Sequence, residues 1–310
     1  MEIISFYKFL TLDHLETLRA ELLEMCQNNQ ISGSILIAPE GINGTISGRA
    51  EDICKVTDYF QSSELFAPME FKKSLHETKP FRRMLVRIKK EIITMKMNGI
   101  DPTHLTGKYL APLQLKEWLD HGEDILLLDT RNDYEVKVGT FKGAIDPGIK
   151  SFSAFPDFIE KHIDEFKGKK IVTFCTGGIR CEKATAYMVS RGLTETYQIE
   201  GGVLKYFEDT QPLESDNHWD GECVVFDSRL AVDKALQPTK VKLCYSCFDP
   251  LNEGFQEALC LKCQEVQILA SKSRMETGQD KYLKNFEERR KFLEKSRAEK
   301  HWLSENNLNS

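Results

Sequence analysis

The central part of the chain contains the segment Val172-Thr-Phe-Cys-Thr-Gly-Gly-Ile-Arg-Cys-Glu-Lys183, in which two cysteines stand around a pair of glycines. Four apolar or β-branched residues, 171–174, run directly into Cys175, which is the composition of a buried strand. After a pair of glycines, apolar residues recur at helical spacing from Ala184 to Leu193. The stretch therefore predicts a strand, a tight loop and a helix.

The predicted loop has the chemistry of an anion-binding turn with a cysteine at its mouth. A glycine-rich turn that opens a helix points its backbone N–H groups inward, and the helix dipole adds positive potential there. A cysteine in that place is favoured as thiolate, and Arg180 would lower the thiol pKa further if its side chain turned inward. A lone cysteine would suggest a buried structural residue, but the strand–Cys–Gly–Gly–Arg–helix context favours a reactive one. We predict an active-site loop of Thr176, Gly177, Gly178 and Ile179 between the catalytic residues Cys175 and Arg180.

The loop is short, and a second cysteine follows it. Four residues separate Cys175 from Arg180, one fewer than in the phosphate-binding loop of phosphatases. The shorter loop favours a sulfur atom or a small oxidised group over a phosphate as its ligand. Cys181 would lie in the first turn of the helix, as a second redox thiol or as a packing residue. Cys175 is therefore the expected nucleophile or persulfide carrier, and Cys181 is a candidate resolving thiol.

Length and pattern divide the 310-residue chain into three parts. Residues 1–97 alternate strand-like and helix-like pieces, which suggests a ferredoxin-like βαββαβ domain. The expected pieces are strands at 3–9, 34–38, 44–47 and 85–95 and helices over the leucine stripe 12–22 and near 50–60. Pro39 to Gly44 supplies turn residues, with Asn43-Gly44 suited to positive φ, and is either a hairpin turn or a ligand-contacting loop.

The second part, residues 110–212, is predicted to be an α/β domain with a parallel sheet. The continuous apolar run from Ile125 to Leu128 is typical of a buried parallel strand, and helical patterns separate it from the strand before Cys175. Residues 213–310 then form a small cysteine-rich segment with a charged tail. The tail from Lys272 to Lys300 should be a helix that is solvated and packed on the body, because its charges are of mixed sign.

Several blocks of sequence are similar to those of one family. The loop from Cys175 to Arg180, with Asp129-Thr-Arg131 before it and Glu200-Gly-Gly202 after it, resembles a rhodanese domain. Further blocks resemble the rhodanese-related tRNA uridine hydroxylases: Ile37-Ala-Pro-Glu-Gly-Ile-Asn-Gly-Thr45, Leu128-Asp-Thr-Arg-Asn-Asp-Tyr-Glu135, Gly139-Thr-Phe-Lys-Gly-Ala144, Cys175 to Ala184 and Val225-Phe-Asp-Ser-Arg229.

This resemblance implies a tRNA-modifying enzyme. The implied reaction is oxygen-dependent hydroxylation of the wobble uridine to 5-hydroxyuridine, with the rhodanese-type cysteine essential. Thr140 stands where many rhodaneses carry a histidine, which weakens a plain sulfur-transfer interpretation. The alternatives are a sulfurtransferase that passes persulfide sulfur to a small acceptor or to tRNA, and a binding module with an inert loop.

An RNA partner requires local positive charge, because the chain as a whole carries a net charge of −6. Nine basic residues stand against three acidic ones between Glu70 and Lys96. Phe71 and Phe81 could stack on splayed bases there, although a solvated strand with core phenylalanines is an equal alternative. The candidate RNA-binding residues are Lys72, Lys73, Arg82, Arg83, Arg87, Lys89 and Lys90.

Four of the nine cysteines stand in two Cys-x-x-Cys pairs. Cys244, Cys247, Cys260 and Cys263 have the spacing of a tetrahedral site, and a closed shell of four thiolates predicts structural zinc. Two disulfides or four reduced thiols are the alternatives. Cys26, Cys54 and Cys223 are expected to be small buried residues.

The sequence also indicates which cofactors and which cellular location to expect. Molecular oxygen is the implied co-substrate, and no flavin, haem or nicotinamide site is visible among the motifs or the seven histidines. An apolar leader is not expected, since Lys8 interrupts Ile3 to Leu10, and no apolar run approaches the length of a membrane span. We therefore expect a cytoplasmic protein with tRNA as partner and no membrane contact; the sequence does not specify its oligomeric state.

Overall fold

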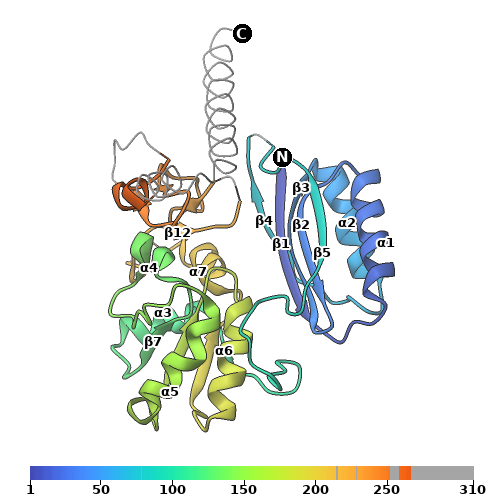
Figure 1. Ribbon diagram of the computed structural model, residues 1–310. Coiled ribbons are helices and arrows are strands. Elements are labelled where there is room, and N and C mark those ends of the chain that lie inside the picture. The colour runs from blue at the N-terminus through green and yellow to red at the C-terminus, as the bar shows by residue number, and fades with distance from the viewer. Residues whose placement is uncertain (78, 214–215, 228, 252–257, 267–310) are drawn as a thin grey trace, which may run out of the picture. The chain divides into compact units, whose positions relative to one another are not determined.

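A computed structural model describes residues 1–77, 79–213, 216–227, 229–251 and 258–266 of the chain (Figure 1). The chain divides into two compact units, Met1–Lys242 and Leu243–Ser310. The first unit contains two α/β domains in sequence, and the second contains the paired cysteines. The predicted helical tail from Lys272 to Lys300 lies outside the described residues.

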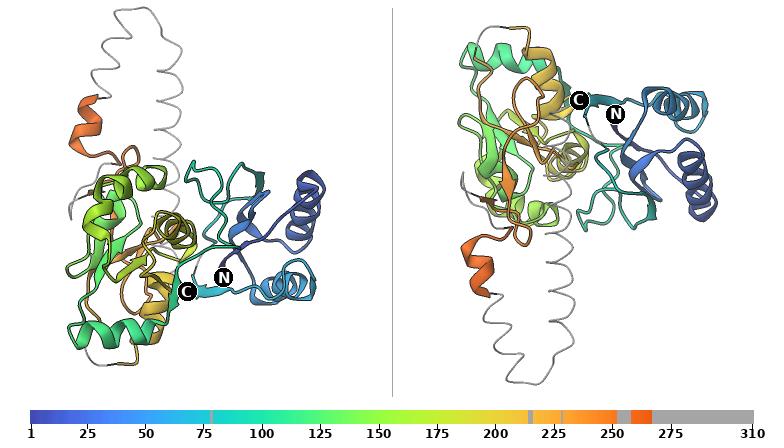
Figure 2. Two further views of the ribbon diagram at one scale, coloured as in Figure 1. Left: turned by 90° about the horizontal axis from the view of Figure 1, so that it is seen from below. Right: turned by 90° about the horizontal axis from the view of Figure 1, so that it is seen from above.

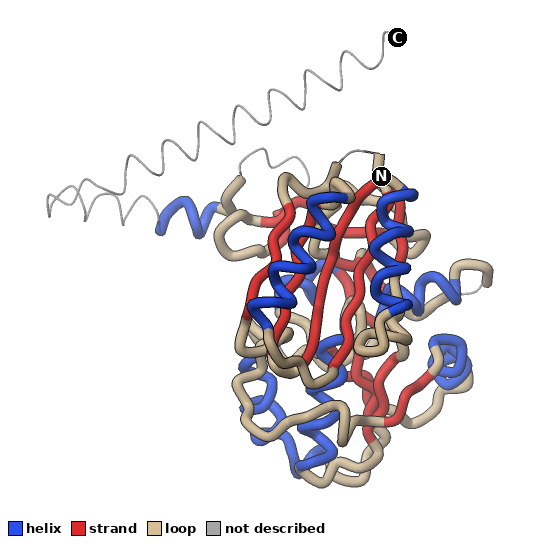
Figure 3. Tube along the Cα trace, turned by 90° about the vertical axis from the view of Figure 1, so that its right-hand side faces the viewer, coloured by secondary structure: helices blue, strands red, loops and turns tan. Residues whose placement is uncertain are grey.

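The N-terminal domain is a five-stranded sheet with two helices on one face (Figures 2 and 3). Its elements are β1 (Glu2–Phe9), α1 (Leu15–Asn28), β2 (Ser32–Ala38), β3 (Gly41–Gly48), α2 (Ala50–Ser62), β4 (Lys72–Leu75) and β5 (Met84–Ile88). The strand order is β4-β1-β3-β2-β5, antiparallel except that β5 runs parallel to β2. Ile4 and Phe6 of β1 pack with Leu22 of α1 and Phe60 of α2 in one core. The predicted ferredoxin-like domain is confirmed.

Two details of this domain differ from the sequence-based expectation. The fourth strand of the βαββαβ unit is β4, whereas the segment expected at 85–95 forms only the short additional strand β5. β4 cannot be recognised from the sequence, because Lys72–Leu75 is a polar edge strand without an apolar pattern. The tight turn lies at residues 39–40, and Asn43 and Gly44 are inside β3, where Gly44 lies against the ring of Phe6.

The second domain has a four-stranded parallel sheet in the order β6-β10-β9-β7. Its elements are β6 (Lys108–Leu110), α3 (Pro112–Asp120), β7 (Leu126–Asp129), α4 (Asp133–Val138), β8 (Gly139–Phe141), η1 (Phe152–Ala154), α5 (Phe155–Phe166), β9 (Ile171–Phe174), α6 (Ile179–Ser190), β10 (Thr196–Ile199) and α7 (Gly202–Thr210). The strand, loop and helix predicted around Cys175 are present as β9, the loop and α6.

Both faces of this sheet are covered, as the continuous apolar runs predicted. Val172 and Phe174 of β9 pack on one side with α3 and α7, while Ile171 packs on the other side with α5 and α6. Successive residues of a strand point to opposite faces, so the residues of each strand contribute alternately to the core on one face and to the core on the other. The predicted parallel-sheet domain is confirmed.

Residues 219–232 continue into this domain. β11 (Trp219–Gly221) pairs with β8, and β12 (Cys223–Val224) pairs with β13 (Ala231–Val232). The indole of Trp219 is fully buried and packs edge-on against Phe141, at 5.0 Å between ring centroids. This segment therefore closes one side of the core that carries the cysteine loop.

β14 (Lys242–Leu243) begins at the last residue of the first unit and pairs with β15 (Pro250–Leu251) of the second unit, in which residues 261–266 are helical. Across the ranges that the structure describes, no helix has both the length and the apolar character needed to cross a bilayer.

Candidate active site

Cys175 lies at the carboxyl end of β9, an interior strand of the parallel sheet. The residue is fully buried, and the loop turns immediately into α6. Gly178 adopts φ +98° at the start of the helix, and its backbone N–H donates to Cys175 Sγ at 3.1 Å. This φ is readily adopted only by glycine, so the loop geometry requires the residue found there.

The environment of Cys175 favours its thiolate. Burial alone would raise the pKa of the Cys175 thiol. A hydrogen bond from the Cys181 thiol, the charge of Arg180 and the backbone N–H groups of Cys181 and Arg180 outweigh burial and hold that pKa well below its usual value. Burial and the neighbouring sulfur raise the pKa of Cys181 well above normal, so Cys181 is the protonated partner.

Arg180 turns inward but is paired. Its Nη1 and Nη2 donate to the two carboxylate oxygens of Glu135 on α4, at 2.6 and 2.8 Å. Glu135 is fully buried, and it also accepts hydrogen bonds from the Thr176 hydroxyl at 3.3 Å and the Asn132 N–H at 3.1 Å. Burial opposes the Glu135 charge, but Arg180 outweighs it and lowers the pKa of this carboxyl. The pair fixes the end of the loop, and Glu135 compensates much of the Arg180 charge.

The block Glu200-Gly-Gly202 holds the other side of the loop. The Val203 N–H on α7 donates to the carbonyl of Cys175 at 2.9 Å, and the Leu204 N–H donates to that of Thr176 at 3.1 Å. A Cβ atom on Gly202 would lie 2.5 Å from the Cys175 carbonyl oxygen, so glycine permits this close approach.

Asp129 and Arg131 form a buried pair under the site. Arg131 is fully buried and donates to Asp129 Oδ2 at 2.7 Å, and its guanidinium lies 5.0 Å from the ring centre of Trp219. The hydroxyl of Thr140 donates to the same carboxylate at 2.9 Å. Thr140, which replaces the histidine of many rhodaneses, thus joins a structural network.

A cavity of about 1140 Å³ opens beside the loop and receives side chains from both domains of the first unit. Phe226 lies on its wall with 59% of its surface exposed, and its ring centre is 5.7 Å from the Arg180 guanidinium. Other lining residues are Tyr7, Lys72, Tyr109, Cys175, Gly177 and Glu182.

Two successive residues of α6 attach the loop to the N-terminal domain. Glu182 accepts from the hydroxyl of Tyr7 on β1 at 3.2 Å and from the hydroxyl of Tyr109 at 3.0 Å. Lys183 is buried and forms ion pairs of 2.7 Å with Glu40 and with Glu91. The Pro39-Glu-Gly block therefore contacts the helix that follows the cysteine loop.

The predicted RNA-binding residues do not form one patch. Lys72 and Lys73 lie on β4, at one edge of the sheet, while Arg87 lies on β5, at the opposite edge. Four strand spacings, about 19 Å, separate these edges. Arg82, Arg83, Arg87, Lys89 and Lys90 are exposed. The partly buried Phe71 ring packs 5.6 Å from Phe6 against the domain core.

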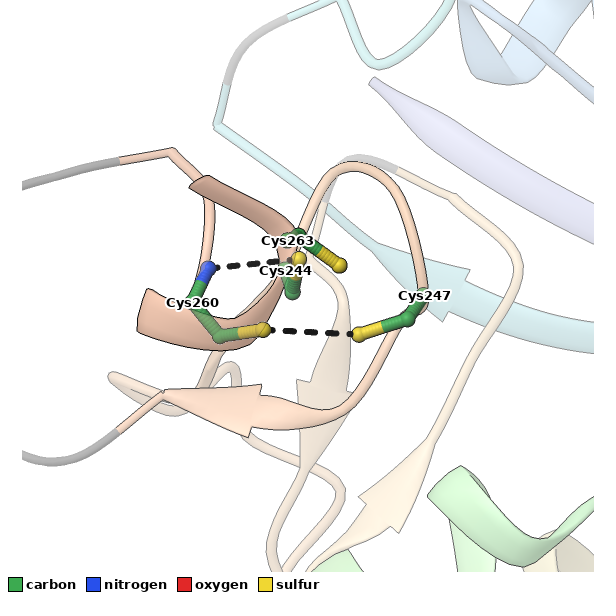
Figure 4. A group of neighbouring side chains, drawn as sticks. All are labelled: Cys244, Cys247, Cys260 and Cys263. Atoms are coloured by element: carbon green, nitrogen blue, oxygen red, sulfur yellow. Dashed lines mark hydrogen bonds between the residues drawn. The ribbon is translucent and has the colours of Figure 1, made fainter. Parts of the chain in front are cut away.

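The paired cysteines converge in the second unit, as their spacing predicts. Figure 4 shows Cys244, Cys247, Cys260 and Cys263, whose sulfur atoms all lie within 4.8 Å of one another. Zinc–sulfur bonds of about 2.3 Å in a tetrahedron place the sulfurs about 3.8 Å apart. Cys247 Sγ and Cys260 Sγ are 3.7 Å apart, so this cluster can bind a metal ion.

The remaining cysteines are not all buried. Cys26 and Cys223 are buried as expected, whereas Cys54 is exposed. Cys54 lies on α2, whose buried face is formed by residues such as Ile53, Val56 and Phe60, and it points to the opposite side.

The domains now define a class: an acylphosphatase-like domain followed by a rhodanese domain with its loop cysteine. Residues 1–92 match the UPF0176 acylphosphatase-like domain family, and residues 111–209 match the rhodanese-like domain family. A tRNA uridine(34) hydroxylase of Ralstonia nicotianae is 47% identical over 79% of this chain and 87% of its own. A second tRNA uridine(34) hydroxylase, from Teredinibacter turnerae, is 40% identical over 88% of this chain and 86% of its own. The chain belongs to the tRNA uridine(34) hydroxylase family.

Sequence reasoning assigned no role to four residues that the structure places at the loop: Tyr7, Glu135, Glu182 and Phe226. The signal available for three of them was their position inside the blocks that carry the family resemblance, at residues 128–135, 175–184 and 225–229. Tyr7 stands outside these blocks, in an ordinary strand pattern.

Proposed function

We propose that this protein hydroxylates the wobble uridine of tRNA, converting it to 5-hydroxyuridine, with Cys175 as the reactive residue. The observation that carries the proposal is the buried, thiolate-favouring Cys175 at the wall of a cavity of about 1140 Å³. Membership in the tRNA uridine(34) hydroxylase family supports the choice of substrate. Such an enzyme would act in the cytoplasm, where its tRNA substrates are found.

The cavity suits a single extruded base. Enzymes that modify a base rotate it out of its stack into a pocket, and extrusion costs least in single-stranded RNA such as the anticodon loop. The exposed ring of Phe226 offers a stacking surface at the cavity wall. A uracil ring on that surface would lie in the same cavity as the Cys175 sulfur.

The net reaction replaces the C5–H bond of uridine by C5–OH. With molecular oxygen as co-substrate, one oxygen atom enters the ring and the other leaves as water. Forming that water takes two protons and two electrons, which we assign to a thiol reductant. Cys175 and Cys181 belong to that chemical class, and their opposite protonation preferences suit a pair that is oxidised to a disulfide and reduced again.

We also propose that the four-cysteine cluster holds a structural zinc ion. Four thiolates would fill a tetrahedral shell and leave no open position for chemistry. Cys244, Cys247, Cys260 and Cys263 would then clip a short segment together.

The test is analysis of tRNA nucleosides from a deletion strain complemented with variants. Wild type should restore 5-hydroxyuridine, Cys175→Ser should restore none, and Cys181→Ser should restore part of it. Full modification by Cys175→Ser would overturn the assignment. A deletion that changes thiolated nucleosides instead would favour the sulfurtransferase alternative.

A further inference from the structure

Lys72 of the N-terminal domain contacts the cysteine loop of the rhodanese domain. Its ammonium group donates to the carbonyl oxygen of Gly177, and its Nζ lies 5.3 Å from the centre of the Tyr7 ring. Lys72 also lines the cavity beside Cys175. No ion pair joins Lys72 to a carboxylate in the described part of the chain, so its hydrogen-bond partner is the loop itself.

The carbonyl that Lys72 binds belongs to the same peptide unit as the N–H that donates to the Cys175 sulfur. The Gly177 carbonyl and the Gly178 N–H share one planar trans peptide, in which the two groups point in opposite directions. Lys72 binds the oxygen end, and the nitrogen end donates to Cys175 Sγ at 3.1 Å. Two glycines flanking this peptide offer little resistance to its rotation, so an external partner is needed to fix it.

We propose that Lys72 is a positioning residue for Cys175, holding the Gly177–Gly178 peptide with its N–H aimed at the sulfur. A cation on the carbonyl also polarises the peptide, which strengthens the hydrogen bond that the N–H donates to a thiolate. The inference rests on the proposed function only in taking Cys175 as the reactive group. It explains why a ferredoxin-like domain is joined to the rhodanese domain: the first domain completes the anion-binding loop of the second.

Charge balance around the loop supports this role. Glu135 compensates the charge of Arg180, whereas none of the described carboxylates forms an ion pair with Lys72. Among the described residues, Lys72 is therefore a cation at the loop that is not neutralised directly. Burial lowers the pKa of Lys72, and the negative charges of Cys175, Glu70 and Glu182 act against that effect. The ring of Tyr7 lies against the Lys72 ammonium group, and burial raises the pKa of the Tyr7 hydroxyl well above normal, which keeps it neutral.

The chain offers a matched control on the same strand. Lys73 follows Lys72 on β4, so its side chain points to the opposite face of the sheet, where it is exposed and paired with Glu2 at 3.2 Å. Lys73→Met removes the same charge from the same strand without touching the loop. Lys72→Met removes the loop contact, and Lys72→Arg keeps a cationic donor.

The experiment measures the pKa of Cys175 in the full chain, from the ultraviolet absorbance of its thiolate after subtraction of a Cys175→Ser reference. We expect Lys72→Met to raise this pKa by about one to three units, the range for loss of an adjacent opposite charge. Lys73→Met should leave it unchanged, and Lys72→Arg should recover most of the shift. The pH profile of 5-hydroxyuridine formation should move to higher pH in Lys72→Met by about the same one to three units, because the thiolate then forms only at higher pH.

An unchanged Cys175 pKa in Lys72→Met would overturn the inference. So would a loss of tRNA affinity in Lys72→Met with the thiol pKa unchanged, because Lys72 would then be a phosphate contact. If the pKa shifts as expected but wild type forms no 5-hydroxyuridine, the positioning role stands and the proposed function fails.

Discussion

Breaking the Arg180–Glu135 pair should lower the unfolding free energy of the protein and, at the same time, lower the pKa of Cys175. In Glu135→Gln, one carboxylate oxygen becomes an NH2 group that faces the Arg180 guanidinium, so two donors meet where a bidentate ion pair stood. Both side chains are almost fully buried, at 6% and 0% exposure. Removing one partner of a buried pair costs about 3–5 kcal/mol, because the remaining charge stays buried and unpaired.

The surface pair of Arg191 and Glu160 provides the control. Its Nε–Oε1 distance is 2.7 Å, similar to the buried pair, but both side chains are more than 40% exposed. Water screens such a pair, so Glu160→Gln should lower the unfolding free energy far less than Glu135→Gln does. Urea unfolding of both variants, followed by tryptophan fluorescence, measures the difference.

The pH dependence of stability adds a second signature. The folded-state pKa of Glu135 is lowered, so its contribution is fully present above the unfolded value of about 4.3 and is lost as the pH falls toward the lower folded value. Wild type should therefore lose this stabilisation in acid, and Glu135→Gln should lack that part of the profile.

Glu135→Gln should also lower the pKa of Cys175 further, since Arg180 then acts on the sulfur without compensation. Equal unfolding free energies for the two glutamine variants, or a Cys175 pKa that rises in Glu135→Gln, would refute this account of the site.

Three further outcomes are expected. Phe226→Ala should lower kcat/KM for tRNA about tenfold, because base stacking on an aromatic ring contributes about 1–3 kcal/mol, and should leave the Cys175 pKa unchanged; full activity would remove Phe226 from the base site. Charge reversal of Arg82 and Arg83 should weaken tRNA binding and flatten its dependence on salt, and an unchanged affinity across a salt series would exclude this surface. Cys247→Ser should abolish stoichiometric zinc in elemental analysis, and far less than one zinc per chain in fresh wild-type protein would contradict the metal assignment.

The elements that local pattern specifies were predictable from sequence. β9, the loop and α6 follow from an apolar run, two glycines and a helical period within about twenty residues, and the cysteine pairs follow from their own spacing. β4 does not follow from the sequence, because three of the four residues of Lys72–Leu75 are polar and the strand is held by backbone pairing with β1 rather than by burial. Backbone pairing between strands leaves no apolar signature at an edge.

The partners of the site were beyond prediction for a different reason. Glu135 lies 45 positions before Arg180, and Tyr7 lies 175 positions before Glu182. Only the packing of whole domains brings such residues together, and no local period encodes it. The opposite also occurs: basic residues that are close in sequence, near 70–96, lie at opposite edges of the sheet.

The first turns of α6 show how the two domains act on one chemical group. Glu182 and Lys183 follow Cys181 directly, and their partners include Tyr7 on β1 and Glu40 in the turn after β2. A helix whose N–H groups stabilise a thiolate must keep its first turn fixed relative to the sulfur, because a hydrogen bond weakens steeply with distance and angle. The buried ion pair of Lys183 and the bonds to Glu182 supply that restraint from outside the rhodanese fold. The N-terminal domain therefore takes part in holding the cysteine loop, independently of any contact between its exposed basic residues and RNA.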